Sequence, residues 1–148
     1  MSDPLEVAGE PTADETFMEW WSKHPRGTIN PEQPRVAIFA TCSGNANDPS
    51  IPRALVDVLE HNECDITVPT QKCCGMPFVD SGDLERAKEQ ARFNVETLHK
   101  QVQDGRKILC PGPSCTLMMK AEYPKLLKSK EAKEVADAVV DAGDFFLQ

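Results

Sequence analysis

Six cysteines are the residues of this 148-residue chain best suited to carry chemistry. Two of them, Cys73 and Cys74, are adjacent in the stretch QKCCGMPF at residues 71–78. A disulfide between neighbours in the chain is strained, because their Cα atoms lie closer together than disulfide geometry prefers. The pair is therefore expected to bind a metal or to do redox chemistry. The other four cysteines are Cys42, Cys64, Cys110 and Cys115.

The cellular compartment decides between a disulfide framework and a metal site. The N-terminal stretch MSDPLEVAGEPTADE is acidic and lacks the basic and apolar regions of a signal peptide, so a cytoplasmic location is expected. In a reducing cytosol, clustered cysteines bind metal or do redox work more often than they form disulfides. We therefore favour a metal site, and a disulfide framework is the alternative for an exported chain.

Charge and hydropathy exclude several classes of partner. Lys and Arg number 16 against 24 Asp and Glu, giving a net charge of −8 without a basic run. Such a chain is poorly suited to nucleic acid or to an anionic membrane surface. No apolar run reaches the roughly 18 residues that a transmembrane helix needs, so no membrane-spanning segment is expected.

The hydrophobic pattern predicts an N-terminal segment followed by one domain. Residues 1–34 are predicted to hold an acidic tail, a short amphipathic helix with both tryptophans, and a proline-rich linker. This helix is expected to dock on the domain, with a partner-binding surface as the alternative. Residues 35–148 are predicted to form a single cysteine-rich domain.

Short apolar runs in that domain alternate with amphipathic helices. The order β-α-β-α-β-α is typical of a small three-layer α/β domain with a parallel sheet and right-handed crossovers. The strands are predicted at 36–41, 65–69 and 107–110, and the helices at about 51–61, 81–103, 115–123 and 130–142.

Five of the cysteines fall where predicted strands lead into helices. These junctions share the carboxyl edge of a parallel sheet, where ligands bind. Helix N-termini at the same edge lower thiol pKa values and so favour the thiolates that bind metal. The sequence therefore predicts one thiolate site, while Cys64, which precedes the second strand, is interpreted as structural. The candidate ligands are Cys42, Cys73, Cys74, Cys110 and Cys115.

The type of metal follows from the donor atoms. Thiolates without a neighbouring histidine favour iron–sulfur or zinc. His24, His61 and His99 lie outside the cysteine loops and are interpreted as surface residues. A structural zinc site usually contains paired CxxC knuckles, which this chain lacks. The spacing modestly favours a cluster of several irons over a single zinc ion.

The motifs around these cysteines resemble a known family. Cys42, then CCG at residues 73–75, then PSC at 113–115 resemble the cysteine-rich CCG domain over roughly residues 35–145. That family includes the CCG-containing polypeptide of heterodisulfide reductase, the iron–sulfur polypeptide of glycolate oxidase and the cysteine-rich polypeptide of anaerobic glycerol-3-phosphate dehydrogenase. The segments KCCGMPF, ARFNVETL and PSCTLMMKAEYPKLL are most similar to the last of these.

The resemblance implies a cofactor and a role. It implies a 4Fe-4S cluster held by Cys42, Cys73, Cys74 and Cys115, with Cys110 as a candidate fifth ligand. It also implies electron transfer inside a larger oxidoreductase, beside a flavoprotein or another iron–sulfur or CCG protein, with membrane contact only through partners. The chain is then a partner-dependent component rather than an enzyme by itself. Two alternatives stay open, namely a zinc-binding scaffold and reduction of a thiol or disulfide substrate at the cluster.

Two departures from the family pattern bear on these expectations. Gly112 stands at the first position of the expected CxxC, and Cys110 lies two residues earlier. The chain also has one CCG motif and no ferredoxin-type cysteine run, whereas many family members carry two CCG domains. We therefore expect one part of a divided polypeptide or of a longer protein.

Overall fold

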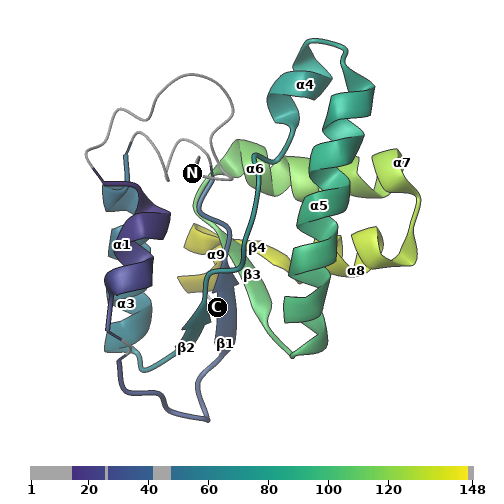
Figure 1. Ribbon diagram of the computed structural model, residues 1–148. Helices are drawn as coiled ribbons and strands as arrows, with labels where there is room; N and C mark the ends of the chain where they lie inside the picture. The colour runs from purple at the N-terminus through teal and green to yellow at the C-terminus, as the bar shows by residue number, and fades with distance from the viewer. Residues whose placement is uncertain (1–14, 26, 42–47, 147–148) are drawn as a thin grey trace.

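A four-stranded parallel sheet forms the centre of the computed structural model, which describes residues 15–25, 27–41 and 48–146 (Figure 1). The spatial order is β2-β1-β3-β4, so the first and third strands are central. Ala37 in β1 lies between Thr67 of β2 and Ile108 of β3. The predicted parallel α/β class is confirmed. The strands are β1 (Arg35–Ile38), β2 (Asp65–Thr67), β3 (Lys107–Cys110) and β4 (Val139–Asp141).

Helices cover both faces of this sheet and make three layers (Figure 1). On one face, α1 (Phe17–Lys23) and α3 (Ser50–His61) pack on the strands, and α5 (Leu84–Gln103) and α8 (Lys130–Ala138) cover the other. Alternate residues of the first strand supply the two cores. Val36 and Ile38 join the cluster with α1 and α3, and Ala37 joins the cluster with α5 and α8. Burial on both faces explains why the strands read as unbroken apolar runs.

The N-terminal helix docks on the domain, as the sequence interpretation favoured. Phe17 and Trp21 are buried in the cluster that contains β1 and α3. A capping box begins the helix, because the Thr16 hydroxyl accepts from the Glu19 N–H and the Glu19 carboxylate accepts from the Thr16 N–H. This reciprocal pairing satisfies two backbone donors that a helix start otherwise leaves open.

The long helix α5 ends at Gln103 as predicted, but it begins at Leu84, three residues later than predicted. Its apolar stripe faces the core, except that Leu84 is 48% exposed. Asp83 caps its N-terminus, and Gly105, with φ of 81°, follows its C-terminus. Ala87, Ala91 and Leu98 of the stripe are fully buried. No helix in the described ranges is long and apolar enough to cross a membrane.

Several elements differ from the prediction. The last helix ends at Ala138, and β4 follows it and pairs with β3; two β-branched valines there suit a strand better than a helix end. The expected loop after Cys74 contains a short helix, α4 (Met76–Asp80). Val58 is an apolar residue of the amphipathic helix α3, yet it is 45% exposed.

The segment after Cys115 does not stop at Pro124. It runs through α6 (Pro113–Leu117), the π-helical turn η1 (Met118–Glu122) and α7 (Tyr123–Leu127). A proline inside an α-helix lacks an N–H and presses its ring against the carbonyl four residues earlier. Here the wider π turn precedes it, with the Tyr123 N–H bonded to the Met118 carbonyl, so the chain continues as a helix. A final short helix, α9 (Ala142–Phe146), follows β4.

A buried arginine joins the strands at their amino ends. The Arg106 guanidinium is 6% exposed and lies 2.9 Å from Asp65 Oδ2 and 3.1 Å from Asp104 Oδ2. It also donates to the carbonyls of Val36 and Asp65, at 3.2 and 2.9 Å. Arg35, 42% exposed, adds a second contact to Asp104 at 2.8 Å. One side chain therefore connects the starts of β1 and β2 to the residues that lead into β3.

Replacement of Arg106 by Met is expected to lower the free energy of unfolding by about 3 kcal/mol, because it leaves carbonyls and part of a carboxylate without their donor. Arg35→Met is the matched control and should cost at most about 1 kcal/mol, since exposed ion pairs contribute little. Urea unfolding of the two variants measures both. Equal losses would contradict the central place given to Arg106.

Candidate metal centre

The candidate site lies where the two central strands end. The chain leaves β1 towards β2 and leaves β3 towards β4, in opposite directions across the sheet, which makes a topological switch point between them. Ligands in open α/β sheets bind outside the carboxyl ends of the strands at such a point. The loops after these strands touch there, because a Cβ added to Gly112 would lie 3.0 Å from Thr41 Cγ2.

Thr41 itself has a left-handed backbone, with φ of 68°, and is 8% exposed. A β-branched residue rarely adopts this conformation, so the turn that leads into Cys42 is strained. Cys42 lies outside the described residues, and its predicted ligation remains a prediction.

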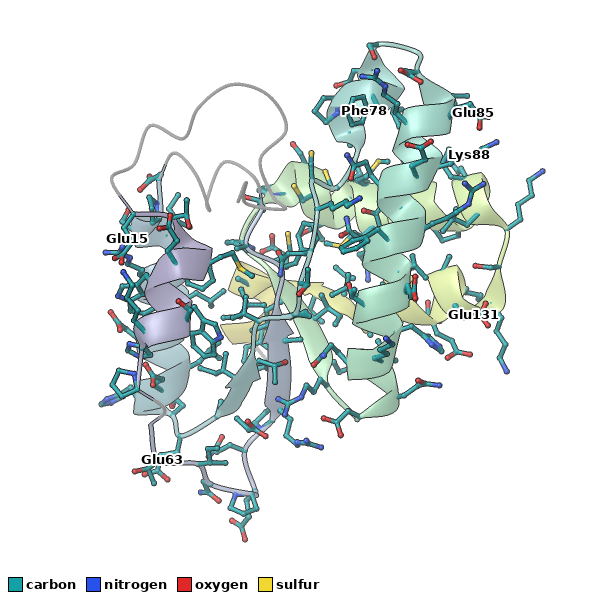
Figure 2. The ribbon with its side chains drawn as sticks, viewed as in Figure 1. Glu15, Glu63, Phe78, Glu85, Lys88 and Glu131 are labelled. Carbon is teal, nitrogen blue, oxygen red and sulfur yellow. The ribbon has the colours of Figure 1, made fainter. Side chains whose placement is uncertain are left out.

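Three of the predicted thiols meet at this edge. The Cys115 thiol is in hydrogen-bonding contact with the thiols of Cys110 and Cys74. Cys73 and Cys74 are each 2% exposed, Cys110 is fully buried, and Cys115 is half-buried. Figure 2 shows sulfur atoms, in yellow, gathered beside α6 at the upper end of the strands. Residues from two loops, far apart in the chain, therefore supply one group of sulfur donors.

The contact between these thiols shifts their pKa values in opposite directions. The pKa of Cys110 is lowered, chiefly because the Cys115 thiol donates to it, and Thr116 adds a second hydrogen bond. The pKa of Cys115 is strongly raised, chiefly because its thiol donates a hydrogen bond to Cys110. The hydrogen bond with Cys74 and burial raise this pKa further. These directions favour ionisation of Cys110 over that of Cys115, and a second thiolate beside the first would need a positive charge to offset their repulsion. A bound metal supplies that charge, because its ligands bind deprotonated.

Buried polar side chains hold the double-cysteine loop, residues 71–75. Gln71 is fully buried, and its Oε1 accepts from the Ala40 N–H at 2.7 Å. Its Nε2 donates to the carbonyls of Ile38 and Pro69, both at 2.9 Å. The loop that follows β2 is thus joined to the end of β1 by side-chain bonds where the strand pairing has stopped.

Asn94 and Tyr123 hold the same loop from the other side. Asn94 Oδ1 accepts from the Lys72 N–H at 2.8 Å, and Nδ2 donates to the carbonyls of Lys72 and Cys73 at 3.0 and 3.1 Å. The Tyr123 hydroxyl accepts from Asn94 Nδ2 at 3.1 Å and donates to the Cys74 carbonyl at 2.8 Å. Sequence reasoning assigned no role to Gln71, Asn94 or Tyr123. The sequence signal that could have indicated a buried polar contact is Asn94, which lies between Ala91 and Leu98 on the apolar face of α5.

The remaining cysteine and the histidines lie elsewhere. Cys64 is buried against the core just before β2, and burial raises the pKa of its thiol. In Figure 2, Glu63, next to Cys64, lies at the opposite end from Phe78, which follows the double-cysteine loop. His61 is exposed as predicted, but the surface assignment is wrong for two histidines. His24 and His99 are half-buried and pair with Glu60 and Glu134, at 2.7 and 2.8 Å.

The donor set decides which kind of group fits this edge. All candidate ligands at this edge are cysteine sulfur atoms, and such soft thiolate donors suit zinc and iron–sulfur groups. Within the described ranges, no group of three or more His, Cys, Asp or Glu side chains is spaced to hold a single metal ion. Two cavities, of about 470 and 590 Å³, are lined by residues of α5 and α8 and of α3 rather than by cysteines.

Comparison with known proteins places the chain in a family. A profile described as "CCG: Cysteine-rich domain" matches residues 36–120. The chain therefore belongs to the CCG cysteine-rich domain family. Together with the convergent thiols, this membership indicates a metal or iron–sulfur cofactor.

Curated relatives share a name. Lactate utilization protein A of an Exiguobacterium species is 40% identical over 96 residues, which are 64% of this chain and 38% of that protein. The protein of that name from Bacillus thuringiensis and lactate utilization protein A 2 of Bacillus mycoides are each 34% identical over 119 residues, 76% of this chain and 48% of theirs. The chain thus spans less than half the length of these relatives. No solved structure matches significantly.

Gly112→Ala is expected to destabilise the fold by about 1–3 kcal/mol, because the new methyl group would overpack against Thr41 Cγ2. The Gly112 φ of −104° suits alanine, so the expected effect is steric. Adding Thr41→Ser, which removes that Cγ2, should restore part of the loss, and a denaturant double-mutant cycle measures the coupling. Strictly additive losses would show that the two loops do not meet.

Proposed function

We propose that this chain binds a 4Fe-4S cluster through Cys42, Cys73, Cys74 and Cys115, with Cys110 as a fifth sulfur donor. In this proposal it is an electron-transfer domain of a larger oxidoreductase. The observation that supports it is the contact between the thiols of Cys74, Cys110 and Cys115 at the switch point of the sheet. Family membership supports the same conclusion.

A cluster accounts for more of the site than zinc does. A tetrahedral zinc ion takes four ligands, whereas five cysteines lie at or after the ends of the three strands β1, β2 and β3. Adjacent cysteines also present sulfur in two directions from one loop, which suits a group with several metal atoms. Gly75, with φ of 99°, lets the backbone turn directly after the pair and begin α4. Zinc is the alternative, and analysis of iron and sulfide content distinguishes a zinc site from an iron–sulfur cluster.

The protein would supply binding, burial and orientation, and a bound cluster would supply one-electron redox chemistry. The near-complete burial of Cys73, Cys74 and Cys110 would keep water from the sulfur ligands. The half-buried Cys115 would form the side that faces solvent or a partner. The thiols must lose their protons on binding, so loading should be favoured at higher pH.

The wider role is inferred from the relatives. We propose that the chain works in an oxidoreductase for the use of lactate or a chemically similar 2-hydroxy acid, beside a flavoprotein or another iron–sulfur or CCG protein. Their greater length is consistent with further domains, supplied here by another polypeptide or another part of this one. A reducing compartment such as the cytoplasm would keep the thiols available. Roles like those of the CCG polypeptides of heterodisulfide reductase or glycerol-3-phosphate dehydrogenase, including disulfide reduction at the cluster, are the alternatives.

Metal and sulfide analysis of protein purified without oxygen tests the cofactor. The expected content is about four iron and four sulfide per chain, as in clusters bound by cysteine thiolates. Cys74→Ser should lose most of both, because it removes a donor from the centre of the site. Cys64→Ser is the matched control and should retain them, since Cys64 lies at the opposite end of the sheet. One zinc without sulfide, or equal retention in both variants, would overturn the proposal.

A further inference from the structure

The double-cysteine loop is held by hydrogen bonds from three side chains of the protein itself. Gln71, Asn94 and Tyr123 are each fully buried, with 0% of their surface accessible to water. Buried polar groups that lose their partners cost about 1–3 kcal/mol each, so this arrangement strongly disfavours other loop conformations. The bonds reach the backbone of Ile38, Ala40, Pro69, Lys72, Cys73 and Cys74.

The Asn94 amide has more acceptors around it than it has N–H groups. An asparagine amide has two N–H groups, and three acceptors lie within 3.1 Å of Asn94 Nδ2, namely two carbonyls and the Tyr123 hydroxyl. If the hydroxyl were removed, the two carbonyls would still satisfy both N–H groups. The Cys74 carbonyl, in contrast, would lose the hydroxyl that donates to it at 2.8 Å. Tyr123→Phe therefore removes the donor to the Cys74 carbonyl, while each N–H of the Asn94 amide keeps a carbonyl acceptor.

We propose that the double-cysteine loop is preformed, held in its ligand-binding conformation before any metal arrives, and that Tyr123 is the positioning residue for Cys74. The inference that the loop is preformed depends only on the hydrogen bonds of Gln71, Asn94 and Tyr123. The effect of Tyr123 on a bound cluster rests on the proposed function. This behaviour differs from that of small zinc domains, which are unfolded without their metal.

An electrostatic consequence follows for a bound cluster. The carbonyl of Cys74 is directed towards the Tyr123 hydroxyl, and those of Lys72 and Cys73 towards Asn94. Without the hydroxyl, the Cys74 carbonyl loses this O–H donor, so less of its negative partial charge is offset close to a sulfur ligand. An added electron is then less stabilised, so Tyr123→Phe lowers the reduction potential. Hydrogen bonds and charge near the sulfur atoms tune this quantity in iron–sulfur proteins.

Hydrogen exchange in the metal-free, reduced 148-residue chain tests the preformed loop. Within this set of hydrogen bonds, the Ala40 N–H donates to Gln71 Oε1, and the Lys72 N–H donates to Asn94 Oδ1. They should exchange slowly, with protection close to that of the buried part of α5. Exchange at the rate of an unstructured peptide, while α5 stays protected, would overturn the proposal. Asn94→Ala should speed exchange at Lys72 more than at Ala40.

Redox titration and electron paramagnetic resonance of the loaded protein test Tyr123. Tyr123→Phe should lower the midpoint potential and change the spectrum of the reduced cluster. The control is Thr67→Val, which deletes a half-buried hydroxyl that bonds to Gln101 Oε1 at 2.7 Å, away from the cysteines. It should lower stability without changing potential or spectrum. An unchanged potential and spectrum in Tyr123→Phe would overturn its positioning role. If the wild-type chain holds no iron, the proposed function fails, while hydrogen exchange still decides whether the loop is preformed.

Discussion

The hydrogen bond from the Ala40 N–H to Gln71 Oε1 is the contact on which the cysteine edge depends. Backbone pairing between β1 and β2 ends at Ala37 and Thr67, several residues before the cysteines. Beyond that point, the side chain of Gln71 bonds to the backbone of Ile38 and Ala40 and keeps the segments that follow β1 and β2 side by side. Because this amide is fully buried, the loop cannot leave without exposing unpaired polar groups to an apolar interior.

The two ends of the sheet are specialised in different ways. At the amino ends, charged groups around Arg106 connect the strands through ion pairs and carbonyl contacts. At the carboxyl ends, neutral amides and a phenol position the chain, and sulfur atoms occupy the centre. A permanent positive charge such as Arg106 would attract thiolates and compete with a metal. Because Arg106 lies at the opposite end of the sheet, it does not pair with the cysteine thiols.

Much of this arrangement can be predicted from the sequence. The features that were not predicted depend on contacts between residues that lie far apart in the chain. The strand at Lys107–Cys110 and the stripe of α5 follow from local hydrophobic pattern and caps. The edge that gathers the cysteines follows from strand order. The strand at β4 was missed because Val139 and Val140 continue a helical pattern until β3 offers them a partner. The roles of Gln71 and Tyr123 depend on contacts with residues 31 and 49 positions away, which no local pattern records.

The unequal burial of the sulfur atoms makes them unequally accessible from solvent. Among the described thiols of this edge, Cys115 alone is half-buried, and Cys73, Cys74 and Cys110 are almost fully buried. In the proposed function, a group that arrives from solvent would reach Cys115 before these three thiols. The same sulfur would be the first of them that a chelator or dioxygen could attack. Assembly and loss of the proposed cluster would therefore both begin at Cys115, in the short helix α6.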